Sequence, residues 1–294
     1  MKSFFKKAYF LTPFKKQLFS LLKIFWVPPA NIHQHLHFHG DIKVTTANAS
    51  SFKIRSYGYQ VENRIFWNGL YGDFERHSLR LWTELCQMSD VIFDIGANTG
   101  IYALLAKAVN PSAKVYAFEP VERVYEKLIK NVELNRFDIA CSPKAISNYN
   151  GEAVIYDTAT EHTYSVTVNR DTNLNPDDSI EVKIQTITLD TFIEQEKLDK
   201  IDLLKIDVEM HEVEALQGFS KYLQRFQPSF LIEILNDDVA NGVYEMIKDF
   251  GYEFYNIDEE KGPHRVERLS KSDVFNFLIC KPEIANRLSK LLHR

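Results

Sequence analysis

Residues Val91–Gly100 read VIFDIGANTG, and this stretch contains a change from strand to helix. The apolar run Val91–Ile95 predicts a short buried strand, and Ile101–Val109 predicts a helix that stops before Asn110-Pro111. Glycines allow a backbone to approach a ligand closely, and a helix N-terminus supplies free amide groups. The stretch therefore predicts either a ligand-binding loop or a tight strand-to-helix turn without a ligand.

The residues of this loop restrict the kind of ligand. A dinucleotide-binding loop would read G-x-G-x-x-G and a nucleoside triphosphate loop would end in Gly-Lys-Ser/Thr, and neither pattern is present. Instead an acidic residue near the strand end is followed by four small or polar loop residues: Asp94, then Gly96, Ala97, Asn98 and Gly100. This order suits a ligand with an amino-acid part, whose ammonium Asp94 would orient while helix amides meet its carboxylate.

The rest of the chain alternates between strands and helices. The expected strands are Lys114–Phe118, Ile139–Ile146, Glu152–Tyr156, Ser179–Leu189, Ile201–Ile206, Phe230–Leu235, Tyr252–Ile257 and Val274–Ile279. The expected helices are Ser78–Cys86, Val121–Asn135, Asp190–Glu196, Glu212–Phe226 and Val239–Phe250. Short apolar strands separated by helices predict an α/β fold with a parallel sheet covered on both faces. Ligands of such sheets bind beyond the carboxyl ends of the strands.

The second strand of this series ends in Phe118-Glu119-Pro120. A carboxylate at that position can accept hydrogen bonds from both hydroxyls of a ribose. Alternatively, Glu119 only caps the helix that follows. Because a candidate ligand loop precedes it, we expect Glu119 to bind a ribose.

Four motifs in this order resemble the FkbM-type S-adenosylmethionine (SAM)-dependent methyltransferases. They are DIGANTGIYALLA, AFEP, LLKIDVEMHEVEALQGF and PSFLIEI. The resemblance covers about Trp67 to Ile257 and includes the approach segment WNGLYGDFERHSLRLW. It implies a class I methyltransferase (Rossmann-like) fold, with a seven-stranded, mostly parallel sheet whose last strand is antiparallel and with helices on both faces. Residues 67–294 would form this domain, and residues 1–66 an N-terminal helical and strand extension.

The resemblance also implies roles for individual residues. Asp94, Gly96, Ala97, Asn98 and Gly100 would surround the methionine part of SAM, Glu119 would hold the ribose, Ala145-Ile146-Ser147 would pass the adenine, and Asp207 would lie close to SAM. The family usually has a glycine after Asp-Val-Glu, where this chain has Met210. That departure would narrow or reshape the acceptor side of the site.

The segment LLKIDVEMHEVE places several ionisable residues at a strand end and helix start. Burial without partners is costly, so these side chains should face the cleft. Methyl transfer to oxygen requires placement of the acceptor and removal of its proton, for which Glu209 and His211 are the candidates. Alternatively, Glu209 and Glu212 stabilise a helix N-terminus and His211 is structural.

The expected activity is O-methylation of a hydroxyl on a carbohydrate, glycan or similar polar small molecule. The same cofactor loop would permit methylation of a nitrogen or a carboxylate. The motifs would also permit a SAM-binding scaffold without turnover, in which Met210 blocks the acceptor pocket, or a nucleotide-sugar enzyme that uses the sheet differently.

The acidic residues at the strand ends could also hold a divalent metal. Asp207, Glu233, Asn236 and Asp237 could form an all-oxygen site suited to Mg²⁺, although the same residues could contact substrate hydroxyls, and we expect no metal. His162 would lie on an exposed loop or face the acceptor.

Charge is distributed unevenly along the chain. Residues 1–40 contain six lysines and no acidic residue; the remainder has 29 basic and 40 acidic residues, a net charge of −11. So acidic a body argues against nucleic acid as a partner. Three widely spaced cysteines give no disulfide framework, and no apolar run is long enough to span a bilayer, so we expect a cytoplasmic protein without a signal peptide.

Residues 13–27 predict a basic amphipathic helix that begins at Thr12-Pro13. Its apolar face would hold Phe14, Leu18, Leu21, Leu22 and Phe25, and its basic face Lys15, Lys16 and Lys23. Such a helix either lies on the inner face of an anionic membrane or packs on its own domain or a second subunit with its lysines in water.

The segment Ile32–Gly40 alternates His33, His35, His37 and His39 with mostly apolar residues. As a strand it would present all four imidazoles on one face, either exposed or binding Zn²⁺, and we expect an exposed face.

Overall fold

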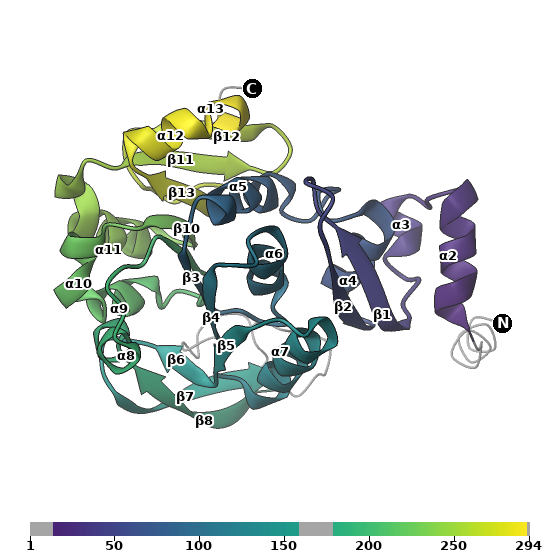
Figure 1. The fold of residues 1–294 in the computed structure, drawn as a ribbon, viewed down its shortest axis with the longest axis horizontal. Coiled ribbons are helices and arrows are strands. Elements are labelled where there is room, and N and C mark those ends of the chain that lie inside the picture. Colours follow the sequence, from purple (N-terminus) through teal and green to yellow (C-terminus); the bar gives the residue numbers. More distant parts are fainter. Residues whose placement is uncertain (1–13, 159–178, 293–294) are drawn as a thin grey trace.

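A computed structural model describes residues 14–158 and 179–292, so His162 lies outside the described residues. Its main element is an eight-stranded sheet (Figure 1). In sheet order the strands are β12 (Gly262–Val266), β11 (Glu253–Asp258), β13 (Asn276–Cys280), β10 (Ser229–Glu233), β9 (Leu203–Ile206), β3 (Val91–Ile95), β4 (Lys114–Phe118) and β5 (Ile139–Ser142).

The five strands from β10 to β5 are parallel, and β13 is antiparallel to both of its neighbours. This is the expected Rossmann-like order with a late antiparallel strand. The eighth strand, β12, pairs with β11 at the edge of the sheet and was not predicted. Its sequence, GPHRV, contains a glycine and a proline, which a strand tolerates best at a sheet edge.

Helices cover both faces of this sheet, as predicted (Figure 1). One face packs against α5 (Arg76–Gln87), α6 (Ile101–Val109) and α7 (Glu122–Asn135), and the other against α8 (Leu189–Glu196), α9 (Glu212–Gln217), α10 (Ser220–Phe226) and α11 (Asp237–Ile247). Each face of the sheet has its own hydrophobic core, the first beside α5–α7 and the second beside α8–α11. Successive residues of a strand point into opposite cores: Ile92 lies in the first and Phe93 in the second. Because both faces are buried, the central strands are almost entirely apolar.

The predicted strand Ile139–Ile146 is two strands in the structure. After β5, the chain leaves the main sheet at Pro143, which has no amide hydrogen to donate. It then forms β6 (Lys144–Ile146) in a second sheet, beside β8 (Ser179–Ile187) and β7 (Gly151–Thr158).

The predicted helix Glu212–Phe226 is also interrupted, between α9 and α10. A Cβ atom on Gly218 would lie 2.1 Å from the carbonyl oxygen of Ser147. This close approach brings the end of β6 against the helix pair, so the break positions a segment of the site.

The N-terminal part packs on the main body through a hairpin of β1 (His39–Thr45) and β2 (Ser51–Tyr57). The Oδ1 of Asn131, on α7, accepts a hydrogen bond from the amide of Arg55 (2.8 Å), and its Nδ2 donates to the carbonyl of Thr99 (2.8 Å). One buried side chain therefore ties the hairpin to the loop between β3 and α6. The predicted boundary after residue 66 falls inside α4 (Gln60–Asn68).

The prediction of a histidine-bearing strand over Ile32–Gly40 is wrong. Residues Ala30–His33 form the short helix α3, and β1 begins only at His39. His33 is buried and stacks on Trp67, with ring centroids 6.2 Å apart. The imidazole of His33 is buried among aromatic side chains, so the four histidines do not share one strand face.

Candidate active site

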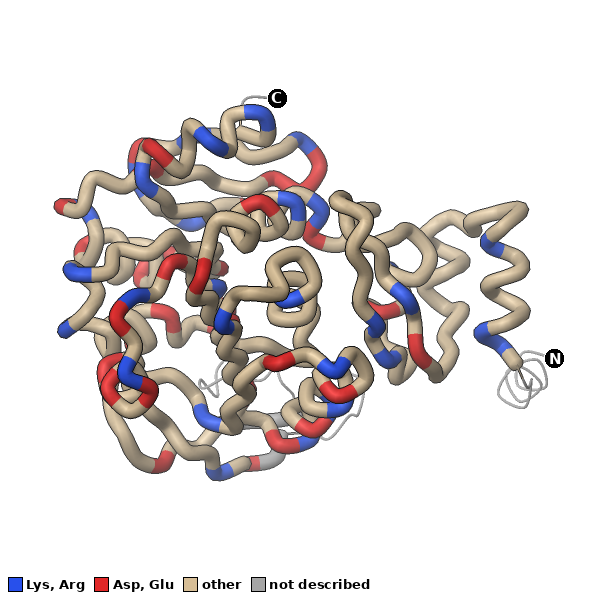
Figure 2. The backbone as a smooth tube through the Cα atoms, viewed as in Figure 1, with Lys and Arg blue, Asp and Glu red and all other residues tan. Residues whose placement is uncertain are grey.

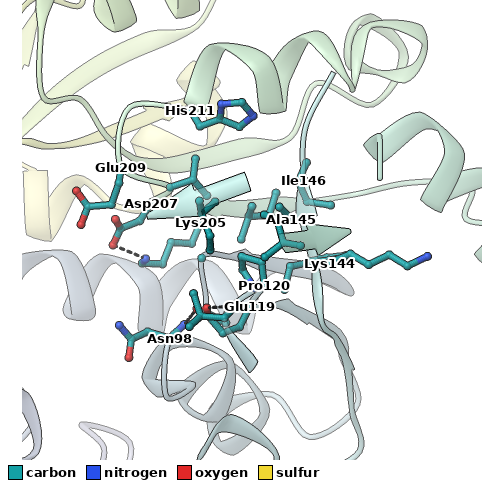
Figure 3. Close-up of a pocket in the computed structure, with 18 of the residues that line it drawn as sticks. Asn98, Glu119, Pro120, Lys144, Ala145, Ile146, Lys205, Asp207, Glu209 and His211 are labelled. Atoms are coloured by element: carbon teal, nitrogen blue, oxygen red, sulfur yellow. Dashed lines mark hydrogen bonds and ion pairs between the residues drawn. The ribbon is translucent and has the colours of Figure 1, made fainter. Parts of the chain in front are cut away.

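A cavity of about 350 Å³ opens at the carboxyl ends of β3, β4 and β9 (Figure 3). In the sheet, β3 lies between β4, which follows it in the chain, and β9, which comes much later. The strand order therefore reverses at β3, and the cavity lies at this point. Its volume lies in the range of small-molecule sites.

The loop after β3 forms one wall of the cavity. Gly96 has φ of 78°, and a Cβ atom there would lie only 1.9 Å from the carbonyl oxygen of Asp207. Only glycine fits this approach. Of the other residues predicted to surround the methionine part of SAM, Ala97 and Asn98 line the cavity and Gly100 does not. Gly100 (φ 92°) instead begins α6, and a Cβ there would meet Leu128 at 2.5 Å, so its role is in packing.

Asp94 lies behind this wall and is not among the residues that line the cavity. Its side chain is fully buried, and its Oδ2 accepts a hydrogen bond from the amide of Ala103 in α6 (2.9 Å). Burial raises the pKa of Asp94 to about 6, against the opposing effects of Lys205 and the Ala103 amide. Asp94 thus holds β3 to α6. The sequence led us to expect its carboxylate in the cavity, but the carboxylate does not line it.

Glu119 lines the cavity at the end of β4 and also accepts hydrogen bonds from two backbone amides (Figure 3). Its Oε2 accepts from the amide of Asn98 (3.0 Å) and its Oε1 from the amide of Val121 (3.0 Å), beside the start of α7. Burial raises the pKa of Glu119 to about 7 despite these two bonds. Each carboxylate oxygen retains a lone pair that could accept a bond from a ligand hydroxyl.

A buried charge cluster forms a second wall. The Nζ of Lys205 donates to Oδ2 of Asp207 (2.9 Å) and lies 4.8 Å from the centre of the Tyr102 ring. The hydroxyl of Tyr102 donates to Oε2 of Glu75 (2.6 Å). Burial alone would lower the pKa of Lys205, but the carboxylates of Asp207, Asp94 and Glu75 outweigh it and raise that pKa. Lys205 is therefore the cation that holds this cluster together.

Glu75 is the member of this cluster that the sequence analysis did not single out. It lies in the approach segment, immediately before α5, with a left-handed backbone (φ 42°). Burial raises the pKa of Glu75 to about 7, although Lys205 and the Tyr102 hydroxyl oppose the shift. The available signal was an acidic residue three positions before the predicted helix Ser78–Cys86. Nothing in the pattern showed that this turn reaches the cavity.

The far end of the cavity is mainly apolar. Ala145 and Ile146 line it together with Ile155 and Ile184 of the small sheet, and Figure 3 shows Ala145 and Ile146 opposite Asp207 and Glu209. A flat aromatic ring is the kind of ligand group that such side chains suit.

Glu209 and His211 both line the cavity, and Figure 3 shows Glu209 beside Asp207 with His211 apart from them. The Nε2 of His211 lies 3.0 Å from Oγ of Ser147, and its Nδ1 lies 3.5 Å from a carboxylate oxygen of Glu214. Burial lowers the pKa of His211, against the effect of Glu214, and so favours the neutral imidazole. The predicted Ser147 thus lines the cavity and also contacts His211.

Glu212, in contrast, has a structural role. It is fully buried, and its Oε1 accepts from the amide of Val208 (3.1 Å) at the start of α9. Because Val208 precedes α9 by four residues, this bond holds the loop between β9 and α9.

Met210 does not line the cavity. Its side chain packs against the second core, and its sulfur accepts a hydrogen bond from the side-chain amide of Asn236 (3.3 Å). Its backbone has φ of 73°, a left-handed conformation that favours glycine. The glycine usual at this position therefore fits the backbone, and the methionine does not block the pocket.

The residues considered for Mg²⁺ do not fit a metal site. The Oδ1 of Asn236 accepts from the amide of Val239 (2.8 Å), and Oδ1 of Asp237 accepts from the amide of Lys271 (2.8 Å). Across residues 14–158 and 179–292, no group of three or more histidine, cysteine or acidic side chains is arranged to hold a metal.

Comparison with known proteins agrees with this geometry. The family model for the methyltransferase FkbM domain matches residues 94–254, more than half of the chain. The chain belongs to the FkbM methyltransferase family. The match begins at Asp94 and ends in β11, so it includes the loop after β3, Glu119 and the segment from Lys205 to His211.

Two curated relatives of this FkbM-family chain have named activities. The hexuronic acid methyltransferase AglP of Haloferax volcanii is 27% identical over 150 residues, which are 51% of this chain and 58% of AglP. The 31-O-demethyl-FK506 methyltransferase FkbM of Streptomyces tacrolimicus is 29% identical over 168 residues, which are 49% of this chain and 64% of that protein. The chain thus matches about three fifths of the length of these relatives.

Among solved structures, an O-methyltransferase from Bacillus cereus in complex with SAH overlaps with a TM-score of 0.39 and 15% identity, covering 69% of this chain and 78% of the other. The family assignment rests on the sequence match, not on this overlap.

Proposed function

We propose that this chain transfers the methyl group of SAM to a hydroxyl oxygen of a carbohydrate or similar polar small molecule. The observation that carries the proposal is the cavity itself. It joins a glycine wall, a carboxylate at the end of β4, an apolar recess and an acidic end. Its lining residues fall within the matched segment 94–254, except Val61, Phe74 and Glu75, which precede it.

SAM would supply an electrophilic methyl group on its sulfonium sulfur. Its ribose hydroxyls would donate to Glu119, whose two oxygens are held in place by the amides of Asn98 and Val121. The adenine would lie in the recess lined by Ala145, Ile146 and Ser147.

The ammonium of the methionine part needs a carboxylate within the cavity. Asp94 is buried behind the loop, whereas Glu75 lines the cavity and is oriented by the Tyr102 hydroxyl. We therefore assign the ammonium to Glu75, with Asp207 beside it. Gly96, Ala97 and Asn98 would provide the backbone against which this part of SAM lies.

Methyl transfer breaks the carbon–sulfur bond, forms a carbon–oxygen bond and leaves the hydroxyl proton to be accepted by the protein. The two ring nitrogens of His211 are held by Ser147 and Glu214, so His211 is assigned to shaping the acceptor side of the cavity and not to removing the proton. Glu209 is a carboxylate on the same wall and is assigned as the base. The acidic character of this end suits a neutral polyol better than an anionic polymer, and nucleic acid is not proposed as a partner.

The two curated relatives support oxygen as the methylated atom. One acts, by its name, on a hexuronic acid and the other on a 31-O-demethyl compound. A hexuronic acid carries both hydroxyls and a carboxylate, so methylation of a carboxylate is the alternative that a product analysis must separate.

The test is incubation of the full chain with methyl-labelled SAM and a panel of hexuronic acids, neutral sugars and amino sugars. The proposal expects label in a product that resists mild alkali, as a methyl ether does. An alkali-labile product would instead indicate a methyl ester, and label only on amino sugars would indicate nitrogen. Protein that binds SAM without labelling any class would support a scaffold without turnover.

A further inference from the structure

The helix α2 (Lys15–Phe25) lies at the outer edge of the N-terminal part (Figure 1), and most of its predicted apolar face is exposed. Phe14, Leu18, Leu21 and Phe25 are 74%, 53%, 56% and 81% exposed. The exposed side chains continue past the helix. The outer apolar surface consists of Phe14, Leu18, Leu21, Ile24, Phe25, Trp26 and Val27. Of the expected apolar face, only Leu22 packs against the first core, and the other four residues stay exposed.

The opposite side of α2 is firmly packed. Phe19 is buried, with its ring 6.2 Å from that of Phe38 and 5.7 Å from that of Trp67. The Nζ of Lys23 donates to the carbonyl of Phe66 and lies 5.3 Å from the centre of its ring. These contacts hold α2 in one orientation on the body, so the outer apolar surface has a fixed position.

Charge distinguishes among the occupants that could cover this surface. Figure 2 shows lysines and no acidic residue along α2, and the sequence of residues 1–40 carries six lysines without an acid. A second copy of the chain would bring two such cationic segments together, which repel each other. An anionic bilayer complements the charge and accepts the apolar side chains at the same time.

The shape of the surface also favours a bilayer. A helix pair buries a narrow stripe of side chains, whereas this surface includes Ile24 and the non-helical Trp26 and Val27 beside the stripe. Tryptophan and phenylalanine are common where proteins meet the headgroup region. Within the described residues no helix is long and apolar enough to cross a membrane, so any such contact would be with one leaflet.

We infer that the outer apolar surface docks this protein on the surface of an anionic lipid bilayer. Docking here does not depend on the proposed methyl transfer. It would bring the body to the bilayer with α2 lying in the headgroup region, where the half-buried Lys15 and Lys16 would meet the lipid phosphates while Lys23 stays packed on Phe66.

The experiment is co-sedimentation of the full chain with vesicles of phosphatidylcholine alone or mixed with phosphatidylglycerol, at low and high salt. We expect binding to the mixed vesicles, and binding that weakens as salt screens the lysines. Leu21→Glu with Phe25→Glu should lower the partition coefficient at least about tenfold, because it places two anions in the apolar contact. Lys15→Ala with Lys16→Ala should lower it about tenfold.

Phe275→Glu is the matched control, since Phe275 is an exposed aromatic (43%) far from α2 in the sequence, and it should bind vesicles like the unchanged chain. Circular dichroism of each variant checks that it is folded. Sedimentation velocity without lipid tests whether a second copy of the chain covers this surface instead. Absence of vesicle binding by the folded chain would overturn the inference, and so would a dimer that Leu21→Glu with Phe25→Glu dissociates.

Discussion

The Nζ of Lys205 lies 2.9 Å from Oδ2 of Asp207, and both side chains line the same cavity. Lys205 is almost fully buried, with only 8% of its side chain exposed. Its charge also acts on Asp94 and Glu75, so one ammonium group offsets three carboxylates. The acidic end of the cavity depends on this lysine.

Replacing Lys205 should therefore destabilise the protein. We expect Lys205→Met to lower the free energy of unfolding by about 3 kcal/mol, because it leaves several buried carboxylates without a cation. Asp207→Asn is the comparison: Lys205 still faces Asp94 and Glu75, so the loss should be smaller. Urea denaturation at pH 8 measures both, and equal losses would show that Lys205 acts only on Asp207.

Glu75 should control the pH dependence of SAM binding. Its pKa is about 7, and only the ionised carboxylate attracts the ammonium of SAM. SAM affinity should accordingly rise between pH 6 and pH 8. Glu75→Gln should lower the affinity at pH 8 by about tenfold to a hundredfold, as expected for loss of a charge-assisted hydrogen bond. It should also reduce the rise with pH, and the part that remains would come from Glu119, whose pKa is also about 7.

Calorimetric titrations at the two pH values distinguish this assignment from that of Asp94. Asp94→Asn keeps an acceptor for the Ala103 amide and should preserve SAM affinity within a few-fold. A large loss in Asp94→Asn together with unchanged binding by Glu75→Gln would return the ammonium to Asp94.

Gly96 and Gly69 form a matched pair for testing the loop. Their φ angles are 78° and 79°, but a Cβ on Gly96 would meet the Asp207 carbonyl at 1.9 Å, whereas nothing lies within 4 Å of one on Gly69. Gly69→Ala should cost only the strain of a backbone with φ 79° and ψ 173°, about 1–3 kcal/mol. Gly96→Ala should cost clearly more and abolish SAM binding, as thermal unfolding with and without SAM would reveal. Similar effects of the two substitutions would mean that the loop can move away from β9.

Glu209 and His211 should differ in how they affect turnover. If Glu209 removes the acceptor proton, Glu209→Gln lowers kcat by about 10²-fold or more with little change in SAM affinity. His211→Asn should raise KM for the acceptor more than it lowers kcat. Steady-state kinetics on the acceptor found by the labelling screen separates the two, and unchanged kcat in Glu209→Gln would remove the glutamate as the base.

The sequence predicted the fold well because its signals are local. The strand at Val91–Ile95, the small residues after it and the position of Glu119 each follow from a short stretch of chain. The sequence could not show that Asp94 points into the packing against α6, because depth behind a loop depends on how β3 and α6 meet. The approach segment could not show that Glu75 reaches the cavity, because that contact joins residues 130 positions apart, at Glu75 and Lys205.

The orientation of α2 is a similar case. Its periodicity identified an apolar face but not the partner of that face, and a domain-packed helix was one expectation. The structure instead packs Phe19 and Lys23 inward. Aromatic contacts from Trp67 and Phe66 decide this, and they come from a part of the sequence about forty residues away.

The central claim, that this cavity is a SAM site, is tested most directly by calorimetric titration of the full chain with SAM and, separately, with NAD. We expect micromolar SAM binding, no response to NAD, and loss of SAM binding in Gly96→Ala but not in Gly69→Ala. Folded protein that does not bind SAM, or that binds NAD in its place, would contradict the assignment of the cavity and of the residues that line it.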